Sequence, residues 1–134
     1  MTPPVHLAAN AVIGSCLFAA GIVRTPAELG LFISYSVLID ADHILYFASR
    51  FAMRPLKEII RQAKHDRSHM VPHLYIFHSP EFNLLLLAGA FVSHAIFLLF
   101  VSNMIHILLD IIEHYRYHRN FRWMKKWSIV WSCI

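Results

Sequence analysis

The segment SPEFNLLLLAGAFVSHAIFLLFV, residues 79–101, decides the fold class of this chain. It opens with a Ser and a Pro, which are typical of the cap and first turn of a helix. The apolar run that follows is long enough to cross a bilayer, which takes roughly 20 residues. The segment predicts a membrane-spanning helix over residues 80–101, with Asn103 marking a tight turn after it.

The composition of the whole chain agrees with a membrane setting. Of its 134 residues 57% are hydrophobic and 15% are charged, and the mean hydropathy is +0.51. A soluble domain of this length is ordinarily less apolar. The net charge of +4 needs no nucleic-acid partner, because all but one of the Lys and Arg residues lie in two blocks, 50–67 and 116–126. Such blocks are expected to face cytoplasm and anionic lipid.

Four apolar segments predict an all-α, single-domain bundle over residues 1–134, with spans at about 5–23, 26–47, 80–101 and 104–119. The second span follows Thr25-Pro26-Ala27-Glu28, a capping-box pattern. The first lacks the basic leading region of a cleaved signal peptide, so we interpret it as a span, although Ala19-Ala20-Gly21 loosely resembles a cleavage site. The fourth can span only if neighbouring helices cover its His and Asp side chains.

The polar stretch 48–79 is the expected cytoplasmic loop. Within it, residues of about 55–66 place apolar and charged side chains on opposite helical faces, which predicts an amphipathic helix on the membrane surface. A short soluble helix packed on the bundle is the alternative. The loop and the Trp-containing tail 120–134 hold most of the basic residues, whereas the loop between the first two spans has only Arg24. Both termini are therefore expected in the cytoplasm.

This topology gathers side chains that bind metals at the cytoplasmic ends of the spans. Ionisable groups within apolar helices are rarely kept without a partner. His106 and Asp110 are four residues apart and share a helical face, as Asp40 and His43 do at a spacing of three. We expect a metal site whose ligands are His6, Asp40, His43, His78, His106 and Asp110.

The mixture of imidazole and carboxylate favours Zn, with Mn or Fe as alternatives, and the number of ligands allows one or two divalent ions. Asp42 lies about 200 degrees round the helix from Asp40, so it is a second ion's ligand, an orienting group or a base. His78 precedes a helix start, where an anion can also bind. For Ser79, a helix cap and a direct role in the site are equally good explanations.

In order and spacing, these residues resemble the bacterial membrane-bound metal-dependent hydrolase family, which includes a LexA-regulated inner-membrane protein. The family pattern is Gly-His, Pro-Asp-x-Asp-His, His-Arg-x-x-Thr-His-Ser and Ser-His-x-x-x-Asp. This chain departs from the pattern at three positions: Ile39 replaces the family's Pro, Leu74 its Arg and Phe77 its Thr. A looser similarity connects the His and Asp pattern to zinc-dependent phospholipase C. The segments that carry the resemblance are Val5-His6, Ile39-Asp40-Ala41-Asp42-His43, His73-Leu74-Tyr75-Ile76-Phe77-His78-Ser79 and Ile105-His106-Ile107-Leu108-Leu109-Asp110.

The resemblance implies a hydrolase of the bacterial inner membrane. A divalent ion lowers the pKa of its water towards about 7 and polarises a phosphoryl or acyl oxygen, and Asp42 and His73 would be the catalytic groups that move protons. A site in the inner leaflet suggests a lipid or lipid-linked ester or phosphoester as substrate. The alternatives are divalent-metal transport or sensing, and haem binding by His94 with His43 or His106.

Overall fold

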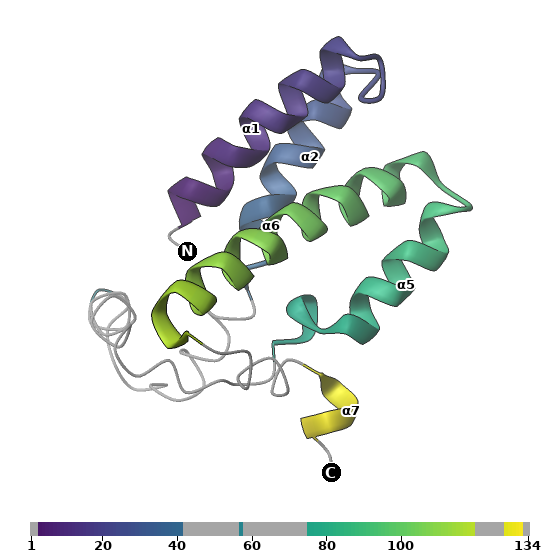
Figure 1. The fold of residues 1–134 in the computed structure, drawn as a ribbon. Helices are drawn as coiled ribbons and strands as arrows, with labels where there is room; N and C mark the ends of the chain where they lie inside the picture. Colours follow the sequence, from purple (N-terminus) through teal and green to yellow (C-terminus); the bar gives the residue numbers. More distant parts are fainter. Residues whose placement is uncertain (1–2, 42–56, 58–74, 120–127, 133–134) are drawn as a thin grey trace.

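The computed structural model describes residues 3–41, 57, 75–119 and 128–132 (Figure 1). The prediction of an all-α chain with four main helices is confirmed for this part. A short 3-10 helix, η2 (Ile76–His78), precedes the third helix, and a short helix, α7 (Ile129–Ser132), follows the fourth. The four main helices are α1 (Pro3–Ala19), α2 (Pro26–Leu38), α5 (Pro80–Ala90) and α6 (His94–His118).

The main helices form two hairpins, α1 with α2 and α5 with α6 (Figure 1). α6 packs against α1 and α2 as well as against α5, so it is the central helix. The start of α1, the end of α2 and the start of α5 therefore lie beside the second half of α6. We call this the near end of the bundle, and we call the opposite end, with the turns at residues 20–25 and 91–93, the far end.

Two helix starts form as their sequences predict. The Thr25 hydroxyl accepts a hydrogen bond from the Glu28 N–H at 3.1 Å, and the Glu28 carboxylate accepts one from the Thr25 N–H at 3.3 Å. At α5, the Ser79 hydroxyl accepts from the Phe82 N–H at 3.1 Å. These caps satisfy backbone donors that a helix start leaves without intrahelical partners.

The predicted turn at Asn103 is wrong, and with it the boundaries of the last two spans. The chain turns at residues 91–93 instead, and one helix, α6, runs through Asn103 without a break. The Asn103 side-chain amide donates to the Phe77 carbonyl oxygen at 3.2 Å and to Asn83 Oδ1 at 2.9 Å. These contacts with neighbouring segments outweigh the preference of Asn for turns.

Among the described helices, α6 is long and apolar enough to cross a membrane, over His94–Arg116. α1 and α2 are shorter apolar helices, and α5 has 11 residues where a span over 80–101 was expected. Most of the remaining predicted elements lie outside the described residues: the end of the second span (42–47), the amphipathic helix at about 55–66 and most of the tail 120–134.

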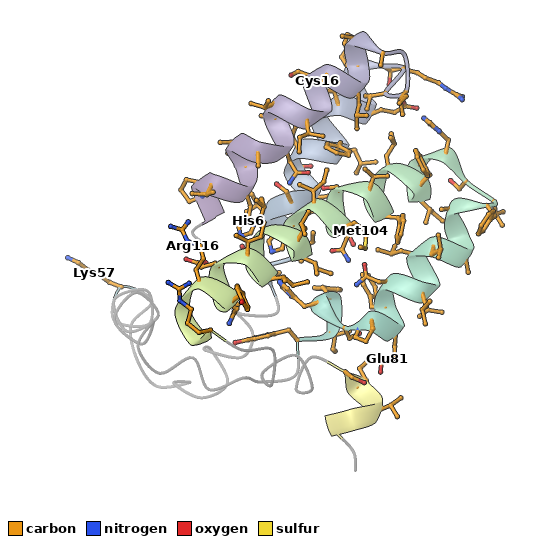
Figure 2. All side chains as sticks on the ribbon, in the orientation of Figure 1. His6, Cys16, Lys57, Glu81, Met104 and Arg116 are labelled. Atoms are coloured by element: carbon orange, nitrogen blue, oxygen red, sulfur yellow. The ribbon has the colours of Figure 1, made fainter. Side chains whose placement is uncertain are left out.

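The described interior is largely polar at the near end, where Ile39 and Ile107 are also buried, and apolar towards the far end. Val23, Phe32 and Leu98 form the apolar part and are at most 1% exposed. Many side chains of the described helices point outwards (Figure 2), and several large apolar ones are exposed. Leu85 is 72% exposed and Val92 is 89% exposed. The buried polar residues are His6, Asn10, Ser36, His78, Ser79, Ser102, Asn103, His106 and Asp110.

Candidate metal centre

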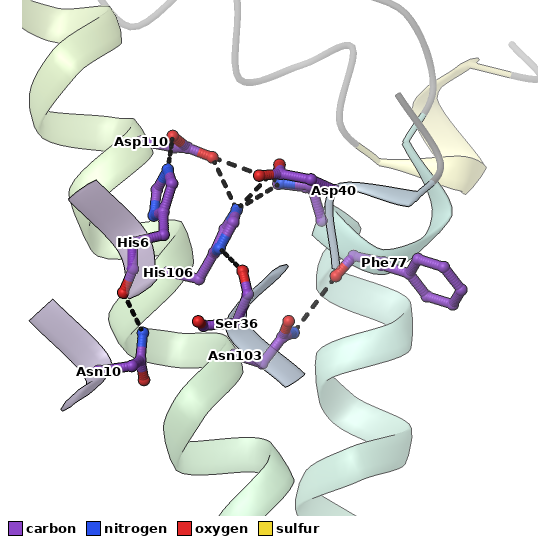
Figure 3. Close-up of polar contacts among 9 residues, drawn as sticks. His6, Asn10, Ser36, Asp40, Phe77, Asn103, His106 and Asp110 are labelled. Carbon is purple, nitrogen blue, oxygen red and sulfur yellow. Dashed lines mark hydrogen bonds and ion pairs between the residues drawn. The ribbon is translucent and has the colours of Figure 1, made fainter. Parts of the chain in front are cut away.

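Four residues place ligand atoms together at the near end of the bundle, and Figure 3 labels three of them, Asp40, His106 and Asp110. Asp40 follows the end of α2, His78 ends η2, and His106 and Asp110 lie one turn apart on α6. One ligand atom from each residue lies within 4.8 Å of the others. The structure thus brings four of the six predicted ligands into one buried group that could hold a metal ion.

The spacing of these atoms suits a small divalent ion. His106 Nε2 lies 3.2 Å from His78 Nε2, 3.2 Å from Asp110 Oδ2 and 3.4 Å from Asp40 Oδ1. His78 Nε2 lies 3.4 Å from Asp110 Oδ2. Ligands bound at about 2.0–2.1 Å in a tetrahedral zinc site are about 3.3 Å from one another. These four separations match that value, and the other two pairs, Asp40 with His78 and Asp40 with Asp110, lie within 4.8 Å.

A backbone carbonyl fixes which nitrogen of His106 carries hydrogen. His106 Nδ1 lies 2.8 Å from the Ser36 carbonyl oxygen, which can only accept, so Nδ1 is the donor. In a neutral ring, Nε2 then presents a lone pair to the carboxylates of Asp40 and Asp110. Facing lone pairs repel, so the arrangement favours a cation between them, either a proton on Nε2 or a metal ion. A metal ion can be shared by all four ligand atoms, including His78 Nε2, whereas a proton is shared by two.

Burial and charge lead to the same conclusion. His106 is fully buried, His78 is 2% exposed and Asp110 is 5% exposed. Two carboxylates with two neutral imidazoles carry two negative charges, which are costly to bury without compensation. A divalent cation balances them. The Asp40 side chain is the most accessible of the four, at 16% exposed, so the group opens on the side of Asp40.

A set of buried polar side chains that the sequence analysis did not select supports the site. The Asn10 side-chain amide donates to the His6 carbonyl oxygen at 3.2 Å, and the Ser102 hydroxyl lies 3.2 Å from Asn10 Oδ1 and 2.9 Å from the Phe32 carbonyl oxygen. These contacts join α1, α2 and α6. The spacing of four could have identified the set, because it places residues on one helical face: Asn10 with His6, Ser36 with Asp40, and Ser102 with His106.

His6, also a predicted ligand, lies beside the group of four rather than within it. Its Nε2 is 3.1 Å from Asp110 Oδ1, and its ring stacks on that of His106, with 3.8 Å between centroids and 16° between planes. The other predicted site residues lie outside the described part of the chain, so their roles stay predictions: Asp42, His43 and His73.

The start of α5 has few backbone N–H groups left to bind the anion that the sequence suggests next to His78. Pro80 has no N–H, the Phe82 N–H is bonded to the Ser79 hydroxyl, and the Asn83 N–H is bonded to the Ser79 carbonyl oxygen at 3.1 Å. Glu81 adds negative charge to the same turn. These contacts favour capping as the role of Ser79.

Comparisons with protein-family models, curated proteins and solved structures find no match to this chain. The buried His and Asp group is therefore the observation from which a function has to be argued. The similarity to membrane-bound hydrolases stays a hypothesis that rests on the short motifs quoted above.

Proposed function

We propose that this chain is a membrane-embedded, metal-dependent hydrolase of the membrane-bound hydrolase type. The observation that supports it most is His106, whose Nδ1 is held by the Ser36 carbonyl and whose Nε2 faces two carboxylates and a second imidazole. Asp40, His78, His106 and Asp110 would hold the ion, and zinc suits this ligand set best. When bound, the ion would activate a water and polarise the substrate oxygen.

The ligand types favour a catalytic over a structural ion. Structural zinc sites are closed and usually rich in Cys, whereas catalytic sites use His and carboxylate and keep a position for water. The described group contains only His and Asp, and an ion held by all four residues would take water as a fifth ligand. Asp40, as its most exposed member, lies where water and substrate would enter.

The distribution of polar and apolar side chains supports a lipid environment. Helices in lipid bury polar groups that bond to one another and expose apolar ones, and soluble domains favour the reverse. Here most buried residues of the near end are polar, with Ile39 and Ile107 as apolar exceptions, and exposed apolar residues such as Leu85 and Val92 lie on the outside. We therefore propose a bacterial inner membrane location, with the near end and both termini on the cytoplasmic side.

Helix geometry suggests the depth of the site. Asp110 lies 16 residues after His94, the first residue of α6, which corresponds to about 24 Å along the helix. The hydrocarbon core is about 30 Å thick. With His94 at the far interface, Asp110 lies within about 6 Å of the near one. That depth suits an ester or phosphoester at the headgroup of a lipid or lipid-linked substrate.

The same geometry weakens the alternatives. A transport path needs ligands at several depths, whereas the buried polar residues of the described chain gather at the near end and Phe32 and Leu98 lie beyond them. His94 lies 12 residues before His106 on α6, or about 18 Å, too far for both to bind one haem iron. The imidazole of His94 instead contacts the Ile22 carbonyl oxygen at 3.0 Å.

Hydrolysis can be tested with the purified protein in vesicles of bacterial polar lipids. We expect water-soluble headgroup products, detected by mass spectrometry, that disappear when a chelator removes the metal and return when zinc is restored. Loss of the metal is expected to lower the rate by about 100-fold or more, because it removes several kcal/mol of transition-state stabilisation. A folded, metal-loaded protein that releases no product from any lipid class would contradict the hydrolase and favour metal sensing.

Orientation can be tested by labelling with a membrane-impermeant maleimide. In a chain whose Cys16 and Cys133 are replaced by Ser, we expect Lys57→Cys to react from the cytoplasmic side and Val92→Cys from the opposite side. Lys57 lies in the basic loop, and Val92 is 89% exposed in the far-end turn. Reaction of both positions from one side of intact vesicles would contradict a bundle that crosses the membrane.

A further inference from the structure

His6 contacts a different oxygen of Asp110 from the one that faces the metal group. His78 Nε2 and His106 Nε2 lie 3.4 and 3.2 Å from Asp110 Oδ2, whereas His6 Nε2 lies 3.1 Å from Oδ1 (Figure 3). Asp110 therefore stands between His6 on one side and the other ligands on the other. The carboxylate needs a fixed rotation to present Oδ2 to a metal ion, and contact with His6 can provide it.

The stacking of the two rings prevents His6 from sharing an ion with His106. A ring nitrogen binds a metal through a lone pair that lies in the plane of the ring. The rings of His6 and His106 are nearly parallel, at 16°, and their centroids are 3.8 Å apart. Their in-plane lone pairs therefore run side by side rather than converging. An ion in the plane of His106 lies well out of the plane of His6.

The contact between His6 and Asp110 is a close polar contact of 3.1 Å rather than a hydrogen bond of good geometry, because neither ring nitrogen of His6 has a hydrogen-bond partner among the described residues. Both side chains are buried, with side-chain exposures of 0% and 7%, which strengthens the interaction. The backbone of His6 is in turn held by Asn10, whose side chain contacts Ser102 on α6.

We infer that His6 is a positioning residue, whose ring stacks on His106, contacts Asp110 Oδ1 and so fixes the orientation in which Asp110 binds the metal. The inference rests on the proposed function, because this role has meaning only in a metal site. It replaces the prediction that His6 is itself a ligand. Partners of this kind typically change metal affinity by about 10- to 100-fold without changing the ligand count.

The test compares zinc binding by the wild type, His6→Ala and His6→Gln, all purified as full-length protein in detergent. Chelator competition gives the dissociation constant and stoichiometry, and X-ray absorption at the zinc edge gives the number of imidazole ligands. His6→Ala should bind as many ions as the wild type, with the same imidazole count and about 10- to 100-fold weaker affinity. His6→Gln keeps an N–H donor within reach of Asp110 and should recover most of that affinity.

Val12→Ala is the control for truncating a side chain of α1, because Val12 is 66% exposed. It should bind zinc as the wild type does. The inference is overturned if His6→Ala loses one imidazole ligand, loses one of two bound ions or binds zinc with unchanged affinity. A wild-type protein that binds no zinc would instead overturn the proposed function, so the two failures can be told apart. Circular dichroism verifies that each variant is helical.

Discussion

Asp110→Asn is expected to leave the protein folded and almost free of metal. Asp110 contacts three histidines of the site, at 3.1, 3.2 and 3.4 Å. Asn has nearly the same volume but lacks the negative charge, so the remaining carboxylate no longer balances a divalent ion. Because even outer partners of metal ligands are worth 10- to 100-fold, we expect metal affinity to fall by about 100-fold or more. Elemental analysis after dialysis measures the loss.

The opposite result is equally informative. If Asp110 were a buried carboxylate without a cation, removing its charge would relieve a desolvation penalty and raise the free energy of unfolding. A variant that retains all its metal and unfolds at a higher temperature would show that Asp110 is not a ligand. Thermal unfolding of the same samples, followed by circular dichroism, distinguishes the two cases.

His106→Gln is expected to have the second largest effect, and the same helix supplies its control. His106 is fully buried in the metal group, whereas His94, 12 residues earlier on α6, contacts the Ile22 carbonyl oxygen at the far end. We expect His106→Gln to abolish stoichiometric metal binding. His94→Gln should keep the metal content of the wild type and lose about 0.6 kcal/mol of stability, typical of a hydrogen bond between membrane helices.

Equal metal content in the two variants would mean that α6 carries no metal ligand at residue 106. Equal loss from both would mean that the helix tolerates no polar substitution and that metal loss reports unfolding. The comparison is direct because the two variants make the same chemical change, at the start and at the middle of one helix.

Local signals in the sequence predicted the helix starts and the convergence of the site. Thr25 and Ser79 cap helices through contacts with residues three positions away, so nearby sequence suffices to predict them. Asp40, His78, His106 and Asp110 meet because alternating helix directions return the chain to the same end. This convergence follows from the hairpin topology, so an error in the position of one turn does not change it.

The roles of Asn103 and His6 depend on tertiary geometry and could not be predicted in this way. Asn is a residue type typical of turns, yet the side-chain amide of Asn103 donates hydrogen bonds to the Phe77 carbonyl oxygen and to Asn83 in neighbouring segments. His6 has the side chain of a ligand, but the tilt of its ring relative to His106 decides what it can bind. The spacing of residues along the chain gives no information about ring planes.

The metal content of the detergent-purified wild-type protein tests the central claim most directly. Purification should include added zinc, manganese and iron, followed by dialysis and elemental analysis, with helicity measured on the same sample. The ligand set of Asp40, His78, His106 and Asp110 predicts about one equivalent of Zn, or of Mn or Fe, per chain. A fully helical protein that retains none of these metals would contradict the account.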